Sequence, residues 1–160
     1  MPSASQSAVK QHVSDDRVLR ISRRLRAPRA LVFKVFTDPA HLARWFGPEG
    51  FTLAECKVEA RVGGVFYVDM RSPEGKPHRA TGRFQAVDVH SRLVLTWAWL
   101  DEADKPGHET LLTFTFEKIG DETELVLLHE RFQDVETRDS HNKGWTGCIN
   151  NLERYLAKQA

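Results

Sequence analysis

An alternation of apolar and polar residues near the start of the chain predicts a strand across residues 17–26. Leu19, Ile21 and Leu25 occupy the apolar face of this strand, and most of the positions between them are polar or charged. A proline follows at position 28. Because proline fits the first turn of a helix, Pro28 indicates that the strand gives way to a helix there.

Two short helices are predicted next. Apolar residues recur at helical spacing over residues 31–36, and the pair Asp38-Pro39 ends this helix, because a residue before proline avoids the helical region. The same pair starts a second helix, with Asp38 as its N-cap. A Gly-Pro pair at positions 47 and 48 stops it. The apolar face of this second helix is formed by Leu42, Trp45 and Phe46.

From residue 51 to residue 132 the pattern changes to short strands separated by turns rich in glycine or charge. These turns lie at residues 61–64, 72–75, 90–92, 101–107 and 120–122. Six strands with such short connections imply an antiparallel meander. The alternation places three groups of residues on single strand faces, namely Leu93, Leu95, Trp97 and Trp99; Leu112, Phe114 and Phe116; and Leu125, Leu127 and His129.

The final segment predicts one long helix. Asp134 is a good N-cap for it, and Glu136 suits the positive end of the helix dipole. Gly144 and Gly147 lie inside this helix, where each costs about 1 kcal/mol relative to alanine. A helix that keeps both glycines uses them for close approach to a neighbour or to leave space. Its inward face is formed by His141, Trp145, Cys148, Leu152 and Tyr155 or Leu156.

The order of these elements predicts an α+β fold. A seven-stranded antiparallel sheet has one apolar face to bury, and the long C-terminal helix is the element available to cover it. Twist and bulges curve such a sheet around the helix, which tends to leave a cavity between the two. We therefore expect a single domain over residues 17–160, and a polar, disordered leader over residues 1–16.

Composition and charge exclude several classes of protein. Hydrophobic residues make up 41% of the chain, which is enough for an ordinary core, and the formal net charge is +1. Lysine and arginine are spread along the sequence without a basic stripe, so we expect no nucleic-acid partner. No run of 18 apolar residues occurs, so we also expect no membrane insertion.

The cysteines and histidines give no signature of a metal site. Cys56 and Cys148 form no Cys-x-x-Cys pair, which argues against zinc and against a disulfide framework, and favours a reducing cytoplasm. The seven histidines lack the spacing of metal ligands. We therefore expect neither a metal nor another cofactor.

Four ordered segments resemble a known family. They read APRALVFKVFTDPAHLARWFGPEGF, ARVGGVFYVDM, TGRFQAVDVHSRLVLTWAW, and LLHERF followed by DSHNKGWTGCINNLERYL. In these segments the chain is similar to the helix-grip superfamily of START and Bet v-type proteins (SRPBCC), within the branch named for homologues of the heat-shock-protein-90 ATPase activator. The resemblance covers about residues 17–158. The chain departs from the family pattern at Trp45-Phe46, where the family often has two tryptophans.

The resemblance implies three functions. The first is binding of a hydrophobic or aromatic small molecule in a cavity between the sheet and the C-terminal helix. The second is an enzyme similar to polyketide cyclases and aromatases, in which a cavity histidine moves a proton. The third is a module that stimulates a chaperone ATPase. The activator that names the family has an additional N-terminal docking domain, which we do not expect here, so the family name alone does not assign this role. A homodimer through the edge strands also stays open.

The candidate ligand-binding residues are Trp45, Phe46, Phe66, Asp69, Arg83, Trp97, Trp99, Phe114, His129, His141, Trp145 and Cys148. Their aromatic rings suit stacking on a flat ligand and suit a packed core equally well. One or two polar groups, from His129, Arg83 or Asp69, would fix the ligand's orientation. A His129–His141 pair across the cavity is the candidate for catalysis, although a histidine on an apolar face is more often a hydrogen-bonded core residue.

Overall fold

The computed structural model describes residues 16–159. The predicted leader, residues 1–16, lies outside the described residues except for Asp16. The predicted order of one strand, two short helices, six strands and one long helix is confirmed. The elements are β1 (Leu19–Leu25), α2 (Arg29–Thr37), α3 (Pro39–Leu42), β2 (Thr52–Val58), β3 (Val65–Arg71), β4 (Pro77–Asp88), β5 (Arg92–Trp99), β6 (Thr110–Ile119), β7 (Glu122–Glu130) and α4 (Val135–Gln159).

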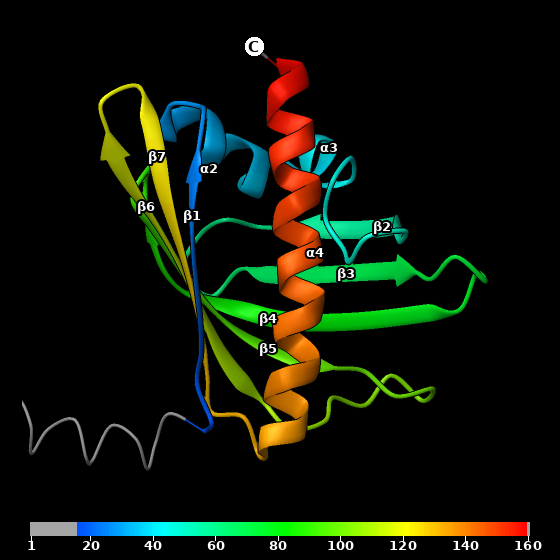
Figure 1. Cartoon of the computed structure of the whole chain (residues 1–160). Helices are drawn as coiled ribbons and strands as arrows, with labels where there is room; N and C mark the ends of the chain where they lie inside the picture. The colour runs from blue at the N-terminus through cyan, green and yellow to red at the C-terminus, as the bar shows by residue number, and fades with distance from the viewer. Residues whose placement is uncertain (1–15, 160) are drawn as a thin grey trace, which may run out of the picture.

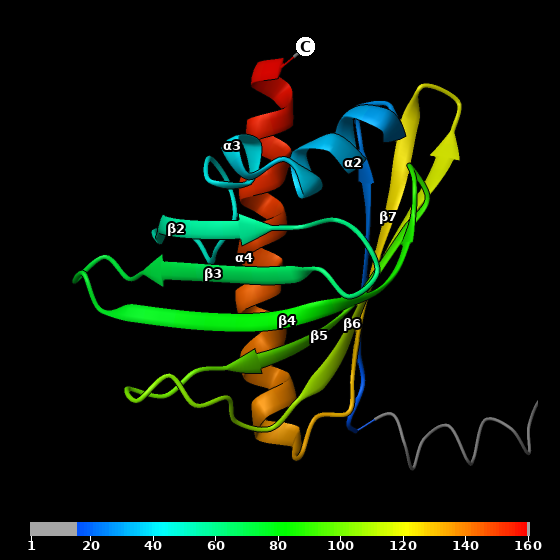
Figure 2. The ribbon, with the colours of Figure 1, turned by 180° about the vertical axis from the view of Figure 1, so that it is seen from behind.

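The strands form one antiparallel sheet in the order β1-β7-β6-β5-β4-β3-β2. Figure 1 shows β1, β6 and β7 running along α4, whereas β2, β3 and β4 cross behind it. Figure 2, the view from behind, shows the same three strands in front of the helix. The sheet therefore curls around α4, and the predicted α+β helix-grip architecture is confirmed.

The sheet bends in the middle of the β4–β5 pair, at Gly82. The absence of a side chain at this residue makes the bend possible. A Cβ atom on Gly82 would lie 1.7 Å from the carbonyl oxygen of Thr96, so no other residue fits here without moving the backbone. The backbone N–H of Arg83 donates to Oγ1 of Thr96 at 2.9 Å. Just beyond, the β4–β5 register shifts between Phe84 and Ala86. Bulges of this kind increase the local twist and bend a strand.

The long helix has the predicted inward face. Asp134 caps its N-terminus, since its Oδ1 accepts a hydrogen bond from the N–H of Thr137 at 2.7 Å. His141 and Tyr155 on the same face are half-buried. The fully buried residues of α4 are Trp145, Cys148, Ile149, Leu152 and Leu156.

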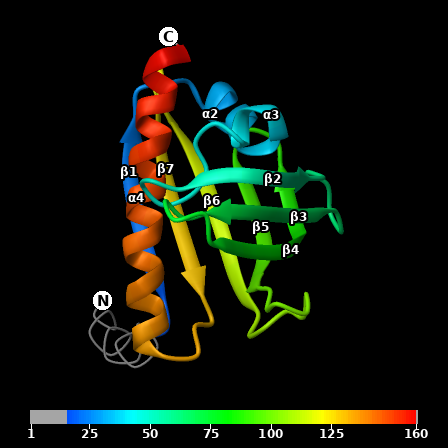
Figure 3. The ribbon, with the colours of Figure 1, turned by 90° about the vertical axis from the view of Figure 1, so that its right-hand side faces the viewer.

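The two short helices differ from the prediction in their limits. Pro28 is the N-cap of α2 rather than part of its first turn. Asp38 caps α3 as predicted, accepting from the N–H of Ala40 at 2.9 Å. However, α3 ends at Leu42, so the predicted longer helix is wrong. Trp45 and Phe46 reach the core from the turn that follows. Figure 3 shows both helices near the C-terminal end of α4.

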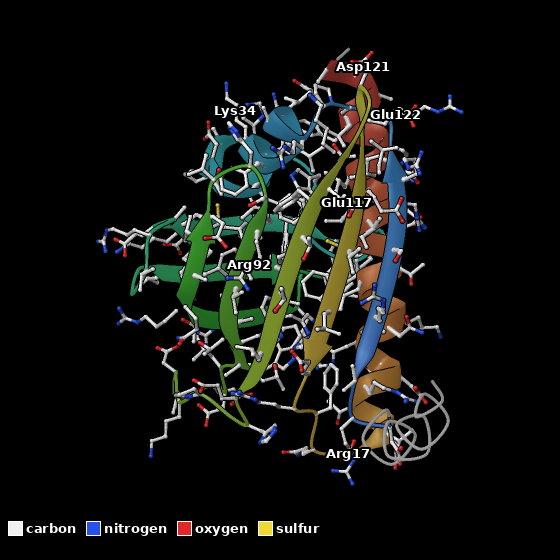
Figure 4. The ribbon with its side chains drawn as sticks, turned by 90° about the vertical axis from the view of Figure 1, so that its left-hand side faces the viewer. Arg17, Lys34, Arg92, Glu117, Asp121 and Glu122 are labelled. Atoms are coloured by element: carbon white, nitrogen blue, oxygen red, sulfur yellow. The ribbon has the colours of Figure 1, made fainter. Side chains whose placement is uncertain are left out.

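The outer face of the sheet, which points away from α4, carries charges of both signs. In Figure 4, Arg92 on β5 and Glu117 on β6 lie on this face, and Asp121 and Glu122 lie at the β6–β7 turn. Arg92 forms an ion pair with Asp88 at 2.8 Å. The charges labelled in this view form no stripe of one sign. Among residues 16–159, no helix is long and apolar enough to cross a membrane.

Candidate ligand-binding cavity

A cavity of about 330 Å³ lies between the N-terminal half of α4, the turn after α3 and strands β3 to β5. This volume falls within the range of small-molecule sites and is about twice that of an engineered apolar cavity that holds benzene. It therefore has room for one or two rings. The cavity is lined by Phe46, Gly47, Pro48, Phe51, Met70, His78, Trp97, Trp99, Ser140, His141, Gly144, Trp145 and Cys148.

Half of the predicted site residues line this cavity. They come from the turn after α3, from β5 and from α4, which the fold brings together from distant parts of the sequence. Trp99, at 37% exposed, is the most open aromatic side chain among them and lies on the solvent side. The six predicted residues that line the cavity are Phe46, Trp97, Trp99, His141, Trp145 and Cys148.

Four other predicted residues are buried in the core and do not line the cavity. They are Trp45, Phe66, Phe114 and His129. Their rings pack against the lining residues from behind. Phe114 contacts Trp145 with ring centroids 5.8 Å apart, and Phe66 contacts Trp97 at 6.2 Å. The interior is thus partly filled by the protein's own side chains, and the open space lies toward the N-terminal half of α4.

Asp69 and Arg83 do not reach the cavity, contrary to the sequence-based expectation. Neighbouring positions Phe66, Val68 and Met70 point inward, so strand alternation turns Asp69 to the outer face. There the Arg71 guanidinium donates two hydrogen bonds of 2.9 Å to the Asp69 carboxylate and holds its pKa below the ordinary value. Arg83 is exposed and donates to the carbonyl oxygen of Gly63 at 3.1 Å.

Several lining residues were not among the sequence candidates. Two of them could have been predicted from the sequence. Met70 shares a strand face with Phe66, and Gly144 lies on the helix face next to Trp145. The remainder come from the loop after α3, from the start of β4 and from the first turns of α4. Their approach depends on how the sheet curls. They are Gly47, Pro48, Phe51, His78 and Ser140.

Trp97 is at the centre of the aromatic wall. Its ring centroid lies 5.4 Å from that of Trp145, 5.4 Å from that of Trp99 and 6.4 Å from that of Phe46. The Trp97–Trp99 pair is T-shaped, with an interplanar angle of 84°. Such edge-to-face and tilted pairs are favourable and hold each ring in one orientation. The wall is therefore rigid and presents both ring faces and ring edges to the cavity.

His129 is completely buried and both of its ring nitrogens are engaged. The indole N–H of Trp145 donates to His129 Nδ1 at 3.0 Å, so the ring proton resides on Nε2. Nε2 lies 2.7 Å from Thr110 Oγ1 and donates to it, while the Thr110 hydroxyl donates to the carbonyl oxygen of Trp97 at 2.9 Å. Burial, with a further contribution from His141, lowers the pKa of His129 to about 2. His129 therefore stays neutral.

His141 is close to His129 but is held separately. Their ring centroids are 5.1 Å apart, which places the predicted pair together. His141 Nδ1 donates to the carbonyl oxygen of Thr137 at 2.8 Å, and its Nε2 accepts from the indole N–H of Trp99 at 2.9 Å. Burial lowers the pKa of His141. With all four ring nitrogens of the pair engaged, neither histidine has an atom free to exchange a proton with a ligand in this arrangement.

Cys148 behaves as the small hydrophobic residue that the sequence suggested. Its Sγ accepts a hydrogen bond from the N–H of Gly47 at 3.3 Å, and burial raises the pKa of its thiol to about 12. Because the thiolate is the reactive form, Cys148 is unreactive at neutral pH.

The difference in burial between Cys56 and Cys148 predicts which of the two thiols is labelled first. At pH 8 we expect iodoacetamide to modify half-buried Cys56 at least about tenfold faster than Cys148 in the folded protein. The two rates should converge in 6 M guanidinium chloride, where burial is lost. Peptide mass spectrometry of timed samples measures both rates. Rapid native labelling of Cys148 would contradict its placement in the cavity wall.

The curled sheet and the long helix packed against it define a helix-grip protein. A family model described as "Activator of Hsp90 ATPase homolog 1-like protein" matches residues 26–157, and the chain belongs to this family. A search of curated protein sequences finds no match.

Solved structures agree with this assignment. The AHSA1 protein of Silicibacter pomeroyi is 28% identical over 89% of this chain and 99% of its own, with a TM-score of 0.83. A protein of Chromobacterium violaceum is 28% identical over 86% of this chain and 95% of its own, with a TM-score of 0.76. A protein encoded in the dynemicin biosynthetic locus shares the fold at 22% identity and a TM-score of 0.71, over 88% of this chain and 47% of its own.

Proposed function

We propose that this protein binds an uncharged aromatic or hydrophobic small molecule in the cavity under α4. The observation that carries the proposal is a space of about 330 Å³ whose walls include five aromatic side chains and no aspartate, glutamate, lysine or arginine. Such a site favours apolar ligands, because burying a charge without a partner is costly. Membership of the activator-homologue family supports a ligand-binding role in general terms.

The size of the cavity sets the expected affinity. A ligand of one or two rings buries on the order of 250 Å² of apolar surface, which contributes about 6 kcal/mol before the cost of association is subtracted. That cost is several kcal/mol. We therefore expect dissociation constants in the millimolar range or weaker for simple bicyclic compounds that gain only from burial. Ligands that also satisfy polar groups should bind more tightly.

The arrangement of the predicted pair, His129 and His141, favours binding over proton transfer by this pair. A general base needs a free lone pair within hydrogen-bond reach of the substrate. Both nitrogens of His129 are already used by Trp145 and Thr110, and those of His141 by Trp99 and Thr137. A cyclase-like role for this pair would require one of these hydrogen bonds to break first. This supports non-covalent binding as the primary role.

Filling the cavity from the helix side tests the proposal. Gly144 lines the cavity, and a Cβ atom there would come no closer than 3.8 Å to Pro48. Gly144→Leu places a branched side chain in the space and should weaken binding of a fluorescent bicyclic probe such as 1-aminonaphthalene at least tenfold. Gly144→Ala should raise the free energy of unfolding by about 0.5–1 kcal/mol, because glycine disfavours a helix, and reduce binding less.

Lys143→Leu is the matched control for this experiment. Lys143 is the preceding residue on the same helical turn and is exposed outside the cavity. The control adds the same side chain to the helix surface and should leave probe binding unchanged. Fluorescence titration measures affinity, and chemical denaturation confirms that each variant is folded. Equal binding by the wild type and a folded Gly144→Leu variant would refute the proposed site.

A further inference from the structure

One histidine of the cavity wall is left free by the protein. His78, at the start of β4, lines the cavity and is half-buried. Within residues 16–159 its ring makes no hydrogen bond or ion pair, and its one aromatic contact is with Phe51, edge to face with ring centroids 5.3 Å apart. It therefore differs from His129 and His141, whose ring nitrogens are all engaged.

The register of the sheet turns His78 toward the cavity. In the β3–β4 pair His78 lies opposite Met70, and residues directly opposite each other in an antiparallel pair share one face of the sheet. Met70 is 3% exposed and lines the cavity. Strand alternation gives the same result, because Ala80 and Phe84 further along β4 are buried on the inner face. The side chain of His78 thus leaves the sheet on the face that α4 covers.

The ring nitrogens of His78 are accessible to a ligand. Among residues 16–159 the single buried side-chain nitrogen or oxygen without a partner is Trp97 Nε1, so the unpaired nitrogens of half-buried His78 keep contact with solvent. Because the side chain lies on the inner face of the sheet, the open space that these nitrogens reach is the cavity. A molecule that enters the cavity therefore meets a free imidazole lone pair.

The free lone pair discriminates among the polar groups that a ligand can carry. Any group that bonds to His78 replaces water, so a net gain requires a better partner than water. A phenolic hydroxyl is more acidic than water and is the stronger donor to the lone pair, whereas an ether or ketone oxygen offers the ring N–H nothing that water lacks. A carboxylate suits the cavity less well, because no lysine or arginine lines it.

We propose that the ligand is a phenolic aromatic molecule whose hydroxyl donates a hydrogen bond to the imidazole of His78. This inference rests on the proposed function and narrows it from uncharged aromatic molecules in general to those with a ring hydroxyl. Burial against the aromatic wall supplies most of the affinity. The hydrogen bond to His78 orients the ligand, with its hydroxyl toward the start of β4 and its ring toward Trp97 and Trp145.

Toluene and p-cresol, which differ by one hydroxyl, test the inference in the wild type and in His78→Phe. The variant keeps a ring beside Phe51 and removes the lone pair. We expect it to weaken the binding of p-cresol relative to that of toluene by about three- to tenfold, the effect of one hydrogen bond exchanged with water. For 4-methylanisole, which accepts a hydrogen bond but cannot donate one, the change relative to toluene should be about twofold or less. NMR titration at pH 7.5 with each compound in the millimolar range measures the affinities.

Ser140→Ala is the comparison variant, because Ser140 is the cavity-lining residue that carries a side-chain hydroxyl. Removing this hydroxyl should keep the ratio of p-cresol to toluene affinity within about twofold of the wild-type ratio. A second measurement uses the wild type alone. The ¹⁵N resonance of the His78 ring nitrogen that carries the lone pair, assigned by its loss in His78→Phe or through the backbone assignments of β4, should move upfield with p-cresol and much less with toluene.

The outcomes separate the two proposals. If the wild type binds none of the three compounds, the proposed function fails for ligands of one ring and the inference fails with it. If it binds toluene and p-cresol but His78→Phe changes both affinities equally, the cavity binds aromatics and the role of His78 is wrong. A relative loss as large for 4-methylanisole, or one that appears in Ser140→Ala instead, also overturns the inference. The resonance shift in the wild type decides the question even if His78→Phe does not fold.

Discussion

A His129→Leu variant is expected to lose about 1–3 kcal/mol of unfolding free energy at pH 7.5 and to match or exceed the wild type below about pH 5. At neutral pH the variant leaves the Trp145 N–H without its acceptor inside the core. A buried donor that loses its partner costs about this much. Leucine fills most of the space of the imidazole, so the loss from a new cavity is small beside it.

The reversal at acid pH follows from the pKa of His129. Burial lowers it to about 2 in the folded protein, whereas a histidine in the unfolded chain has a pKa near 6.5. Below pH 6.5 the unfolded chain therefore binds a proton that the folded protein does not. Folded-state stability falls by about 1.4 kcal/mol per pH unit from this one group, or about 2 kcal/mol at pH 5. Leucine removes this dependence.

Urea denaturation of the wild type and the variant between pH 4.5 and pH 8 measures both effects. The difference between the two curves isolates His129, because His141 and the carboxylates titrate in both proteins. Parallel curves for His129→Leu and the wild type would contradict the neutral, fully bonded state of His129.

Gly82→Ala is expected to destabilise the protein by about 3 kcal/mol or more. The added Cβ atom would lie 1.7 Å from the carbonyl oxygen of Thr96, and a backbone oxygen in a sheet cannot swing aside as a side chain can. Relief requires β4 and β5 to separate at the bend, which also strains the hydrogen bond from Arg83 N to Thr96 Oγ1. Overpacking and backbone displacement of this kind account for the larger single-residue effects.

Gly107→Ala provides the control for Gly82→Ala. A Cβ atom on Gly107 would lie 3.6 Å from the nearest atom, which is an ordinary contact, and its backbone is not in the left-handed region. This exposed loop substitution should change stability by less than about 0.5 kcal/mol. Thermal and urea unfolding compare the two variants directly. A Gly82→Ala protein as stable as Gly107→Ala would show that the strands do not approach so closely at the bend.

Most of the fold could be predicted from the sequence, because the spacing of apolar residues along each strand and helix matches the face that is buried in the structure. Strand alternation in β5 and β7 correctly turned Trp97 and His129 inward, and helical spacing in α4 identified Trp145 and Cys148. The N-caps at Asp38 and Asp134 were also correct. Each of these signals depends on nearby residues alone.

The expectation that Asp69 and Arg83 reach the cavity missed a local signal. Asp69 alternates with the inward-facing Phe66, Val68 and Met70, so strand alternation alone turns it outward. Other features depend on contacts between distant segments. The His129–His141 pair was expected across a cavity. The two rings do come together, but a hydrogen-bond network that involves Trp99 and Trp145 holds them. Such a network becomes visible only when β5, β7 and α4 have been placed.

The division of the cavity between one helix and several strands affects how its specificity could be redesigned. Ser140, His141 and Gly144 lie on consecutive turns of α4, and the strand ladders do not depend on their side chains. A combinatorial library restricted to these positions would reshape one wall while leaving the bend at Gly82 and the wall formed by the strands untouched. Directed evolution could thus vary the shape of the cavity on the helix side while the wall formed by the strands stays the same.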